Sequence, residues 1–540
     1  MKKTLSIVLI LSMIMMAISV TAIADSEQSS ARIVPEGETL ELTIWQTFEA
    51  SKGVTMTSFN DMKTWPLIEE ETGIKVNFKH PAVGSENEQF NLMLASGDMP
   101  DIVFYQWQSV AGGPMKAITD GLILDINDIV AEYCPNYTAV LEKYPEVKQQ
   151  IITDEGVLFG FASISIDERD KTAPDYVPAF QTFGWLIRQD WLEACGIDKL
   201  PETMDEWEAA LTAFKTMDPN GNGEADEIPL VASSASEITN WIRAWGINND
   251  FYIADPEAQT VGYGYYTEEY RDALTTLARW YANGLIDPDF AASDSKQKDS
   301  KITSNIGGAW TGSTSGGFGR YITMMKPENP DLKMTGTTPP TVTAGQTYKF
   351  DSWSKYPIGR EAAISANSEH PIEAAKFCDY FYSEAGHMYM NWGIEGETYV
   401  IGEDGTPEFT ELVTNNPDGL SVDQVLIQYA LSADDFFFCM DPELWLARMS
   451  MPEQREMLPR WATGSLDRIM PPVLPTSDEA AEFASIMGEV NTYVDEMFTK
   501  FVMGVESLDN FDTYMSNLQS LGIERAIELK QNQLDRYNAR

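Results

Sequence analysis

The stretch DPNGNGEADEIP, residues 218–229, gathers six oxygen-bearing side chains into twelve residues. Calcium takes six to eight oxygen ligands, commonly from a loop that turns sharply. The first six residues match the first half of the EF-hand pattern, D-x-[DN]-x-[DN]-G. The second half departs from it, because position twelve is Pro229, which cannot ligate, and because Asp226 and Glu227 come early.

This departure predicts a compact calcium loop between a helix and a strand, since IPLVAS after the loop is typical of a strand. The alternative is an acidic Asn-Gly turn, whose Asx turns would account for the composition. We favour structural calcium, because five side-chain donors exceed what a turn requires and a single loop supplies every ligand. The expected ligands are the side chains of Asp218, Asn220, Asn222, Asp226 and Glu227 and the backbone carbonyl of Glu224.

The helix that positions this loop has a clear start. Thr203 and Glu206 form a capping box, with a hydroxyl at the N-cap and a carboxylate three residues on. The following residues Trp207, Leu211 and Phe214 share one face of a helix. A second capping box at Thr476 predicts the start of a helical C-terminal region.

The N-terminal part of the mature chain alternates strand and helix patterns. LELTIW (40–45) is a predicted strand, TWPLIEEETGIKVNFKH a helix ending at Gly73 and then a strand, and EQFNLMLASGDMPDIVFY a helix, a turn and an apolar strand. This alternation predicts parallel strand pairing in an α/β lobe. A chain of 540 residues is also too long for one simple core, so we expect two or more lobes.

The first residues predict export. Lys2 and Lys3 precede an apolar run and the small residues around Ala24, which predicts a signal peptide over 1–24 with cleavage before Asp25. The run is shorter than the ~20 residues that span a bilayer. Because no cysteine lies near residue 25, a lipoprotein anchor is not expected, and we expect no transmembrane segment in the mature chain.

The formal net charge of −46, near −48 once the two signal lysines are removed, argues against nucleic acid and against anionic membranes as partners. It is compatible with a divalent cation and with neutral ligands. The four cysteines are far apart and show no metal-binding spacing, so free thiols are favoured over disulfides.

Four segments in order resemble the extracellular solute-binding proteins, of the family 1 type, that serve carbohydrate ABC importers. They are ASGDMPDIV (95–103), the stretch from FGWLIRQDWLEACGIDKL to DEIPL (183–230), NWGIEGETYVIGEDGTPEFT (391–410) and the C-terminal stretch 493–537. The loop at 218–227 also resembles that of the large calcium-containing, alginate-oligosaccharide-binding members, after the same helix. The likeness covers essentially the whole mature chain, although the lipoprotein anchor that many members have is missing.

The resemblance implies a two-lobed α/β fold of the type II periplasmic-binding-protein class, with mixed sheets flanked by helices and a hinge between the lobes. Lobe one would comprise residues 38–160 plus 340–392, and lobe two residues 165–335 plus 396–540. GVLFGFASI (156–164) would be the first hinge and the loop 335–345 the second. Such lobes close on a ligand by hinge motion.

An oligosaccharide is the ligand class that the resemblance implies, delivered to the permease subunits of an ABC transporter by a monomeric protein outside the cytoplasm: secreted, surface-associated or periplasmic. Sugar rings pack on flat aromatic side chains and bond to planar polar groups, so we sought such residues at strand ends and in loops. The candidates are Trp45, Phe48, Tyr105, Trp107, Trp310, Trp353, Trp392, Glu395 and Tyr399. For each of them, packing in the core is the competing interpretation.

Two other functions stay open. A secreted glycoside hydrolase would need two catalytic carboxylates, and 83 acidic residues make some pair easy to find. A binding protein for peptides or another solute could use the same fold. The resembling segments favour a sugar-binding protein without catalytic residues. Arg360 could pair with the carboxylate of a uronic acid, although the overall negative charge disfavours a strongly anionic ligand.

Overall fold

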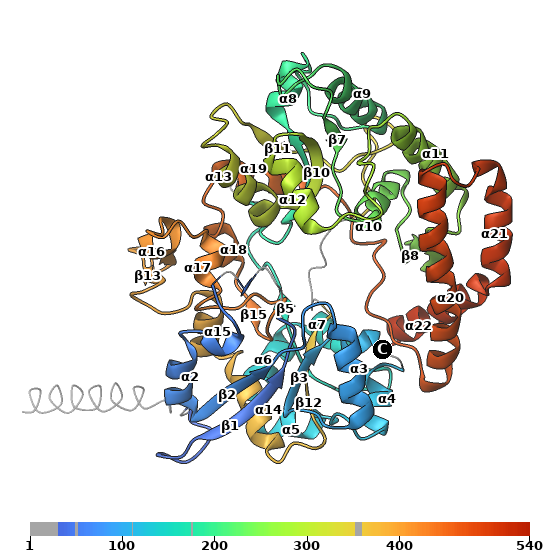
Figure 1. Cartoon of the computed structure of the whole chain (residues 1–540). Coiled ribbons are helices and arrows are strands. Elements are labelled where there is room, and N and C mark those ends of the chain that lie inside the picture. The colour runs from blue at the N-terminus through green and yellow to red at the C-terminus, as the bar shows by residue number, and fades with distance from the viewer. Residues whose placement is uncertain (1–30, 49–51, 54, 111, 174–175, 351–358) are drawn as a thin grey trace, which may run out of the picture.

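The computed structural model describes residues 31–540 except 49–51, 54, 111, 174–175 and 351–358, and it has two lobes (Figure 1). The predicted signal peptide, residues 1–24, and the candidate Trp353 lie outside the described residues. Each lobe is built on a mixed sheet flanked by helices, which confirms the predicted fold class.

The sheet of the first lobe has the strand order β2-β1-β3-β12-β4. Its strands are β1 (Leu40–Trp45), β2 (Ile74–Lys79), β3 (Ile102–Tyr105), β12 (Glu361–Ile364) and β4 (Phe161–Ala162). β1 runs parallel to both β2 and β3, as the alternation of strand and helix predicted. β12 runs antiparallel to β3 and β4, with Glu361 opposite Tyr105 and Ala162. A strand from late in the chain therefore completes this sheet.

Both faces of this sheet are covered. Leu42 and Ile44 point into one hydrophobic cluster and Trp45 into another, as expected from the alternation of side chains along a strand. The covering helices are α2 (Trp65–Thr72), α3 (Glu86–Ser96), α4 (Gly113–Thr119), α5 (Asn127–Tyr133), α6 (Pro135–Lys143), α7 (Pro145–Ile151) and α14 (Pro371–Tyr380). The predicted helix stop at Gly73 is confirmed: Gly73 is the C-cap of α2 at φ 75°, where glycine carries no steric penalty.

The sheet of the second lobe has the order β11-β6-β10-β7. Its strands are β6 (Phe183–Arg188), β7 (Ile228–Leu230), β10 (Gly307–Ser313) and β11 (Met334–Gly336). The flanking helices are α8 (Gln189–Ala194), α9 (Met204–Thr216), α10 (Ala235–Thr239), α11 (Glu268–Ala282), α12 (Ser295–Thr303), α13 (Arg320–Met325), α19 (Pro452–Trp461), α20 (Ser477–Val502), α21 (Phe511–Ser520) and α22 (Ile523–Asn538). Both predicted capping boxes, at Thr203 and Thr476, are present.

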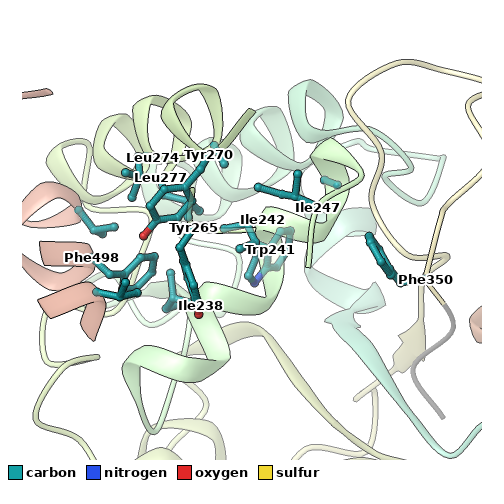
Figure 2. Packing of buried hydrophobic residues seen from close by; sticks show 14 of the residues in the cluster. Ile238, Trp241, Ile242, Ile247, Tyr265, Tyr270, Leu274, Leu277, Phe350 and Phe498 are labelled. Atoms are coloured by element: carbon teal, nitrogen blue, oxygen red, sulfur yellow. The ribbon is translucent and has the colours of Figure 1, made fainter. Parts of the chain in front are cut away.

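The core of the second lobe joins segments that are far apart in the chain. Figure 2 shows Ile238 and Trp241, Leu274 and Leu277 of α11, and Phe498 of α20 converging on one cluster. The Trp241 ring meets those of Trp207 and Trp280 at nearly right angles, an arrangement that aromatic rings favour. The C-terminal helices are therefore part of this core.

A smaller region lies beside the two lobes at the left of Figure 1. It contains α15 (Glu384–Asn391), β13 (Tyr399–Ile401), β14 (Pro407–Phe409), α16 (Glu411–Thr414), α17 (Val422–Leu426) and α18 (Pro442–Ala447). A further strand, β15 (Cys439–Met440), pairs with β5 (Ile164–Ser165). In a separate two-stranded sheet, β8 (Phe251–Asp255) pairs with β9 (Thr260–Tyr263).

Two segments pack differently from the lobe ranges expected from the sequence. Phe436 and Phe438 belong to the cluster of the first lobe, although 396–540 was assigned to lobe two. Conversely, Tyr348 and Phe350 pack into the cluster of the second lobe, although 340–392 was assigned to lobe one. The lobe boundaries themselves stay a prediction. The four cysteines are free thiols, as predicted.

The C-terminal helix of the second lobe is tied to the first lobe by ion pairs. Arg536 binds Asp154 through Nε at 2.6 Å and Glu479, near the start of α20, through Nη2 at 2.6 Å. Arg540 also pairs with Asp154 and donates to the carbonyl oxygens of Ile152 at 2.8 Å and Gln149 at 3.0 Å. These charged groups are all mostly enclosed, so the contact resembles a partly buried network.

We expect Asp154→Asn to lower the free energy of unfolding by about 1–3 kcal/mol, because it removes the charge that two largely enclosed arginines share. Urea unfolding measures this. The matched control is Glu496→Gln, which breaks the exposed pair with Lys500 and is expected to change stability by less than about 0.5 kcal/mol. Equal effects from the two substitutions would contradict the importance of the Asp154 contact.

Candidate functional site

A cavity of about 750 Å³ lies where the two lobes meet. Its walls come from the junction of α6 and α7 in the first lobe, the described residues 166–171 and 176–181 between β5 and β6, and the end of α19 in the second lobe. This size falls within the range of small-molecule sites in proteins, about 300–1,000 Å³. The lining residues are Lys143, Tyr144, Glu146, Ile166, Asp167, Glu168, Lys171, Tyr176, Pro178, Ala179, Phe180, Gln181, Pro459, Ala462 and Gly464.

The wall from the second lobe is held by a close contact between α19 and β6. The ring of Trp461, the last residue of α19, lies against Gly184, where an added Cβ would come within 2.4 Å of the ring. Arg460 fixes the same end of the helix by donating to Thr335 Oγ1 at 2.8 Å and to the carbonyl of Gly336 at 3.0 Å. Gly184 is therefore required for α19 to reach the position from which it lines the cavity.

One charged group in the cavity wall is a carboxylate held by an arginine. Arg169 donates to Asp167 through Nε at 2.8 Å and Nη2 at 2.6 Å, a bidentate contact. The hydroxyl of Tyr176 donates to the same carboxylate at 3.1 Å. Burial alone would raise the pKa of Asp167, but the hydrogen bonds and charge of Arg169 outweigh it and lower that pKa. Asp167 is thus ionised at neutral pH.

A second carboxylate is held by a lysine. Lys143 Nζ lies 2.6 Å from Glu168 Oε2, and its hydrogen bond lowers the pKa of Glu168. Lys143 also lies over the ring of Tyr144, 4.9 Å from its centroid. This places a cation, a carboxylate and an aromatic ring side by side at the edge of the cavity.

Three aromatic side chains line the cavity: Tyr144, Tyr176 and Phe180. Phe180 is mostly buried, while both tyrosines are partly exposed. The pKa of Tyr176 is raised to about 12, first by burial and then by the charge of Asp167, so its hydroxyl keeps its proton. The wall therefore combines flat apolar surfaces with ionised carboxylates that accept hydrogen bonds, which suits a ligand with apolar faces and hydroxyl groups.

The structure does not bring the aromatic residues singled out from the sequence together at this cavity. Trp107, Trp310 and Trp392 are almost completely buried. Their indole N–H groups donate to Val103 O at 3.1 Å, Gly317 O at 3.0 Å and Asp441 Oδ2 at 2.9 Å, respectively. In this conformation these three rings are packed in the interior, and their contact with a sugar stays a prediction.

Four of the other candidates form two separate groups. Trp45 and Tyr105 lie 5.6 Å apart by ring centroids, and Tyr105 stacks on Phe90 at 3.6 Å. Tyr399 is buried beside Trp392, while Glu395 is exposed. Sugar contact for these residues stays a prediction.

Phe48 is the remaining described candidate. It is partly exposed and packs against Phe59 and His80, each with a centroid distance of 5.1 Å. It lies outside the lining of the cavity. Its contact with a ligand therefore also stays a prediction.

The sequence contained a signal for the residues that do line the cavity. Tyr176 and Phe180 stand in the sequence YVPAFQ (176–181), which contains a proline and lies shortly before β6. Aromatic residues in loops at strand ends were expected to line a cleft, but Tyr176 and Phe180 were not among the residues predicted. Tyr144 stands between α6 and α7, and both helices begin at a proline. The break between the two helices leaves Tyr144 partly exposed.

The loop at 218–227 turns around its own polar side chains. Asp218, at φ 47°, accepts hydrogen bonds from the backbone N–H groups of Asn222 at 3.2 Å and Gly223 at 3.0 Å. Asn222 accepts one from the N–H of Glu224 at 2.7 Å. The amide of Asn222 donates to both oxygens of Asp226, at 3.1 and 3.2 Å. The predicted oxygen donors are therefore gathered within one tight turn.

Glu227 is the member of this loop that a turn alone does not explain. Its side chain is 2% exposed, and among the described residues Oε1 has no hydrogen-bond partner. Burial, and also the negative charges of Asp226 and Asp218, raise the pKa of Glu227. Within the described part of the chain no group of three or more His, Cys, Asp or Glu side chains is arranged to hold a metal. A cation here would need the amide oxygens of Asn220 and Asn222 turned inward.

Comparison with known proteins identifies the family. Residues 60–388 match the model of the bacterial extracellular solute-binding protein family, and the chain belongs to this family. It is similar to the fructooligosaccharide ABC transporter substrate-binding protein FusA of Streptococcus pneumoniae serotype 4, with 23% identity over 93% of both chains. It is also similar to lipoprotein LipO of Bacillus subtilis strain 168, with 26% identity over 68% of this chain and 69% of LipO.

Solved structures show the same fold. The crystal structure of the alginate-binding protein AlgQ2 without calcium ion has a TM-score of 0.77 at 24% identity, covering 94% of this chain and 100% of AlgQ2. An EF-hand mutant of FusA in complex with fructo-nystose has a TM-score of 0.73 at 18% identity, covering 93% and 100%. In the part of the chain that the structure describes, no helix is both long and apolar enough to cross a membrane.

We expect Gly184→Ala to lower the free energy of unfolding by about 1–3 kcal/mol, because the new methyl group would overlap the Trp461 ring and push α19 outward. Urea unfolding followed by tryptophan fluorescence measures the change. Gly488→Ala in α20 is the control: apart from the neighbouring residues and backbone of the helix itself, no described atom lies within 4 Å of the added Cβ, and helix propensity favours alanine there by about 1 kcal/mol. A neutral effect at Gly184 would show that α19 does not depend on this contact.

Proposed function

We propose that this protein captures an oligosaccharide in the cavity between its lobes and delivers it to the permease subunits of an ABC transporter. The observation that carries the proposal is the cavity itself, which in a solute-binding protein joins three aromatic side chains and two ionised carboxylates at the meeting of the lobes. The similarity to FusA supports an oligosaccharide over other solutes. We propose further that it acts as a monomer, outside the cytoplasm and without catalysis.

Two carboxylates of the cavity, Asp167 and Glu168, support binding over glycoside hydrolysis. A hydrolase needs one carboxylic acid whose pKa is raised so that it can protonate the leaving oxygen. The pKa values of Asp167 and Glu168 are instead lowered by Arg169 and Lys143. Each is suited to accept hydrogen bonds from sugar hydroxyls and not to donate a proton.

The test is isothermal titration calorimetry with a panel of oligosaccharides, calcium present. We expect saturable heat at one ligand per chain, and a loss of affinity of about tenfold or more in Tyr144→Ala, because stacking of a sugar on the ring is removed. Tyr266→Ala is the matched control, since Tyr266 is a partly exposed tyrosine outside the cavity lining. Heat that continues until the glycan is consumed would mean an enzyme and would contradict the proposal.

We propose that the loop holds a structural calcium ion through Asp218, Asn220, Asn222, Asp226, Glu227 and the carbonyl of Glu224. The buried, unpaired oxygen of Glu227 beside two further carboxylates supports this, because a cation would offset a cost that the loop otherwise bears. The EF-hand of FusA supports it from a relative.

We expect removal of calcium with EDTA to lower the melting temperature, by an amount equivalent to about 3 kcal/mol when free calcium stood at a hundred times its Kd. Glu227→Gln should shrink this shift while leaving the calcium-free protein as stable or more stable, because burying the charge is no longer needed. Differential scanning fluorimetry with and without calcium measures both. A melting temperature that stays unchanged after exhaustive EDTA treatment would contradict the calcium proposal.

A further inference from the structure

Among the described residues, the charged groups that line the cavity carry a slight negative excess. Two lysines, Lys143 and Lys171, stand against three carboxylates, Glu146, Asp167 and Glu168. A site built for an acidic sugar would be expected to present free cations, with arginine as the preferred partner for a carboxylate. The described lining of this cavity instead has more carboxylates than lysines.

The cations near the cavity are largely neutralised by the chain's own carboxylates. Arg169 makes a bidentate contact with Asp167 and also donates to the carbonyl of Val177 at 2.8 Å. Lys143 pairs with Glu168 at 2.6 Å. Lys171 is exposed, where water and salt screen its charge. A sugar carboxylate that is to pair with Arg169 or Lys143 would therefore have to displace a carboxylate already in place.

Arg360, the residue that could have served a uronic acid, is also engaged elsewhere. Its Nη1 donates to the carbonyl oxygen of Asp434 at 2.6 Å, and it lies outside the lining of the cavity. The carboxylates that do line the cavity accept hydrogen bonds, which suits the hydroxyl groups of a neutral sugar. The aromatic surfaces of Tyr144, Tyr176 and Phe180 suit its apolar faces.

We infer that the cavity selects neutral oligosaccharides and excludes uronic-acid oligosaccharides, through carboxylates that are already paired with the cations of the wall. The inference rests on the proposed function and specifies its ligand class. It also separates this protein from a binder of anionic glycans that shares its fold.

The experiment compares matched pairs by isothermal titration calorimetry: trigalacturonate with its methyl ester, and an alginate trisaccharide with its methyl ester, with the neutral trisaccharide kestose added to the panel. We expect the best neutral ligand to bind at least about tenfold more tightly than any free acid at low ionic strength. The ratio should narrow as salt is raised, because screening weakens charge repulsion but not shape exclusion.

Glu168→Gln tests the cause. It removes one negative charge and releases Lys143, so the affinity for a free acid relative to its methyl ester should rise by about threefold or more. Glu41→Gln is the matched control, since it makes the same change in the exposed pair of Glu41 with Lys75 at 2.8 Å, outside the cavity. It should leave the ratio unchanged.

The outcomes separate the two proposals. A free acid that binds as tightly as the best neutral ligand would overturn the neutral selectivity while leaving oligosaccharide binding intact. A preference for neutral ligands that neither salt nor Glu168→Gln alters would overturn the electrostatic cause. If no oligosaccharide of either charge binds, the proposed function fails and the inference fails with it.

Discussion

The pairing of β12 with β3 and β4 is the constraint on which the rest of the molecule depends. Glu361 lies opposite Tyr105 on one side and Ala162 on the other. The last strand of the first sheet therefore follows all the strands of the second sheet in the sequence. The chain must therefore cross between the lobes more than once. The cavity lies along one of these crossings, at the described residues 166–171 and 176–181, and owes its position to that topology. Side chains from both lobes face it because neither lobe is continuous in sequence.

The elements of the fold were largely predictable from the sequence because their signals are local. The strand at 40–45, the helix stop at Gly73 and the capping box at Thr203 each depend on a few neighbouring residues, and the structure has all three. The aromatic contacts were not predictable in the same way. Trp310 and Trp392 stand in glycine-rich or loop contexts, yet tertiary packing buries both. Whether a ring faces a cavity or a core is decided by distant segments that a local pattern does not contain.

The residues that line the cavity also show why a local sequence pattern is not enough to find a site. Tyr144, Asp167 and Pro459 come together although more than 300 residues separate the first from the last. The loop at 218–227 could be found from the sequence because all of its polar groups lie within ten residues. The cavity could not, because its walls meet only after both sheets have formed. Sequence reasoning thus singled out the local polar loop as a candidate and did not single out the residues of the assembled cavity.

Paired charges recur where the lobes meet. In the cavity, Asp167 and Glu168 are each held by a base, and outside it Asp154 is held by two arginines of the C-terminal segment. The largely enclosed pairs of Asp167 and Asp154 offset part of the cost of bringing a charge out of water, and each pair fixes the direction of a side chain. At Asp154 such pairs join segments that are 382 and 386 residues apart in the sequence.

α7 connects the contact at Asp154 with the wall of the cavity. At one end of this short helix, Tyr144 and Glu146 face the cavity; just beyond the other, the carbonyl of Ile152 and the carboxylate of Asp154 are gripped by Arg540. The same helix therefore reaches the cavity wall at its start and, just beyond its end, the ion pairs of the C-terminal segment. If the second lobe moved relative to the first, α22 would move with it, and the displacement would reach the aromatic wall through the seven residues of α7.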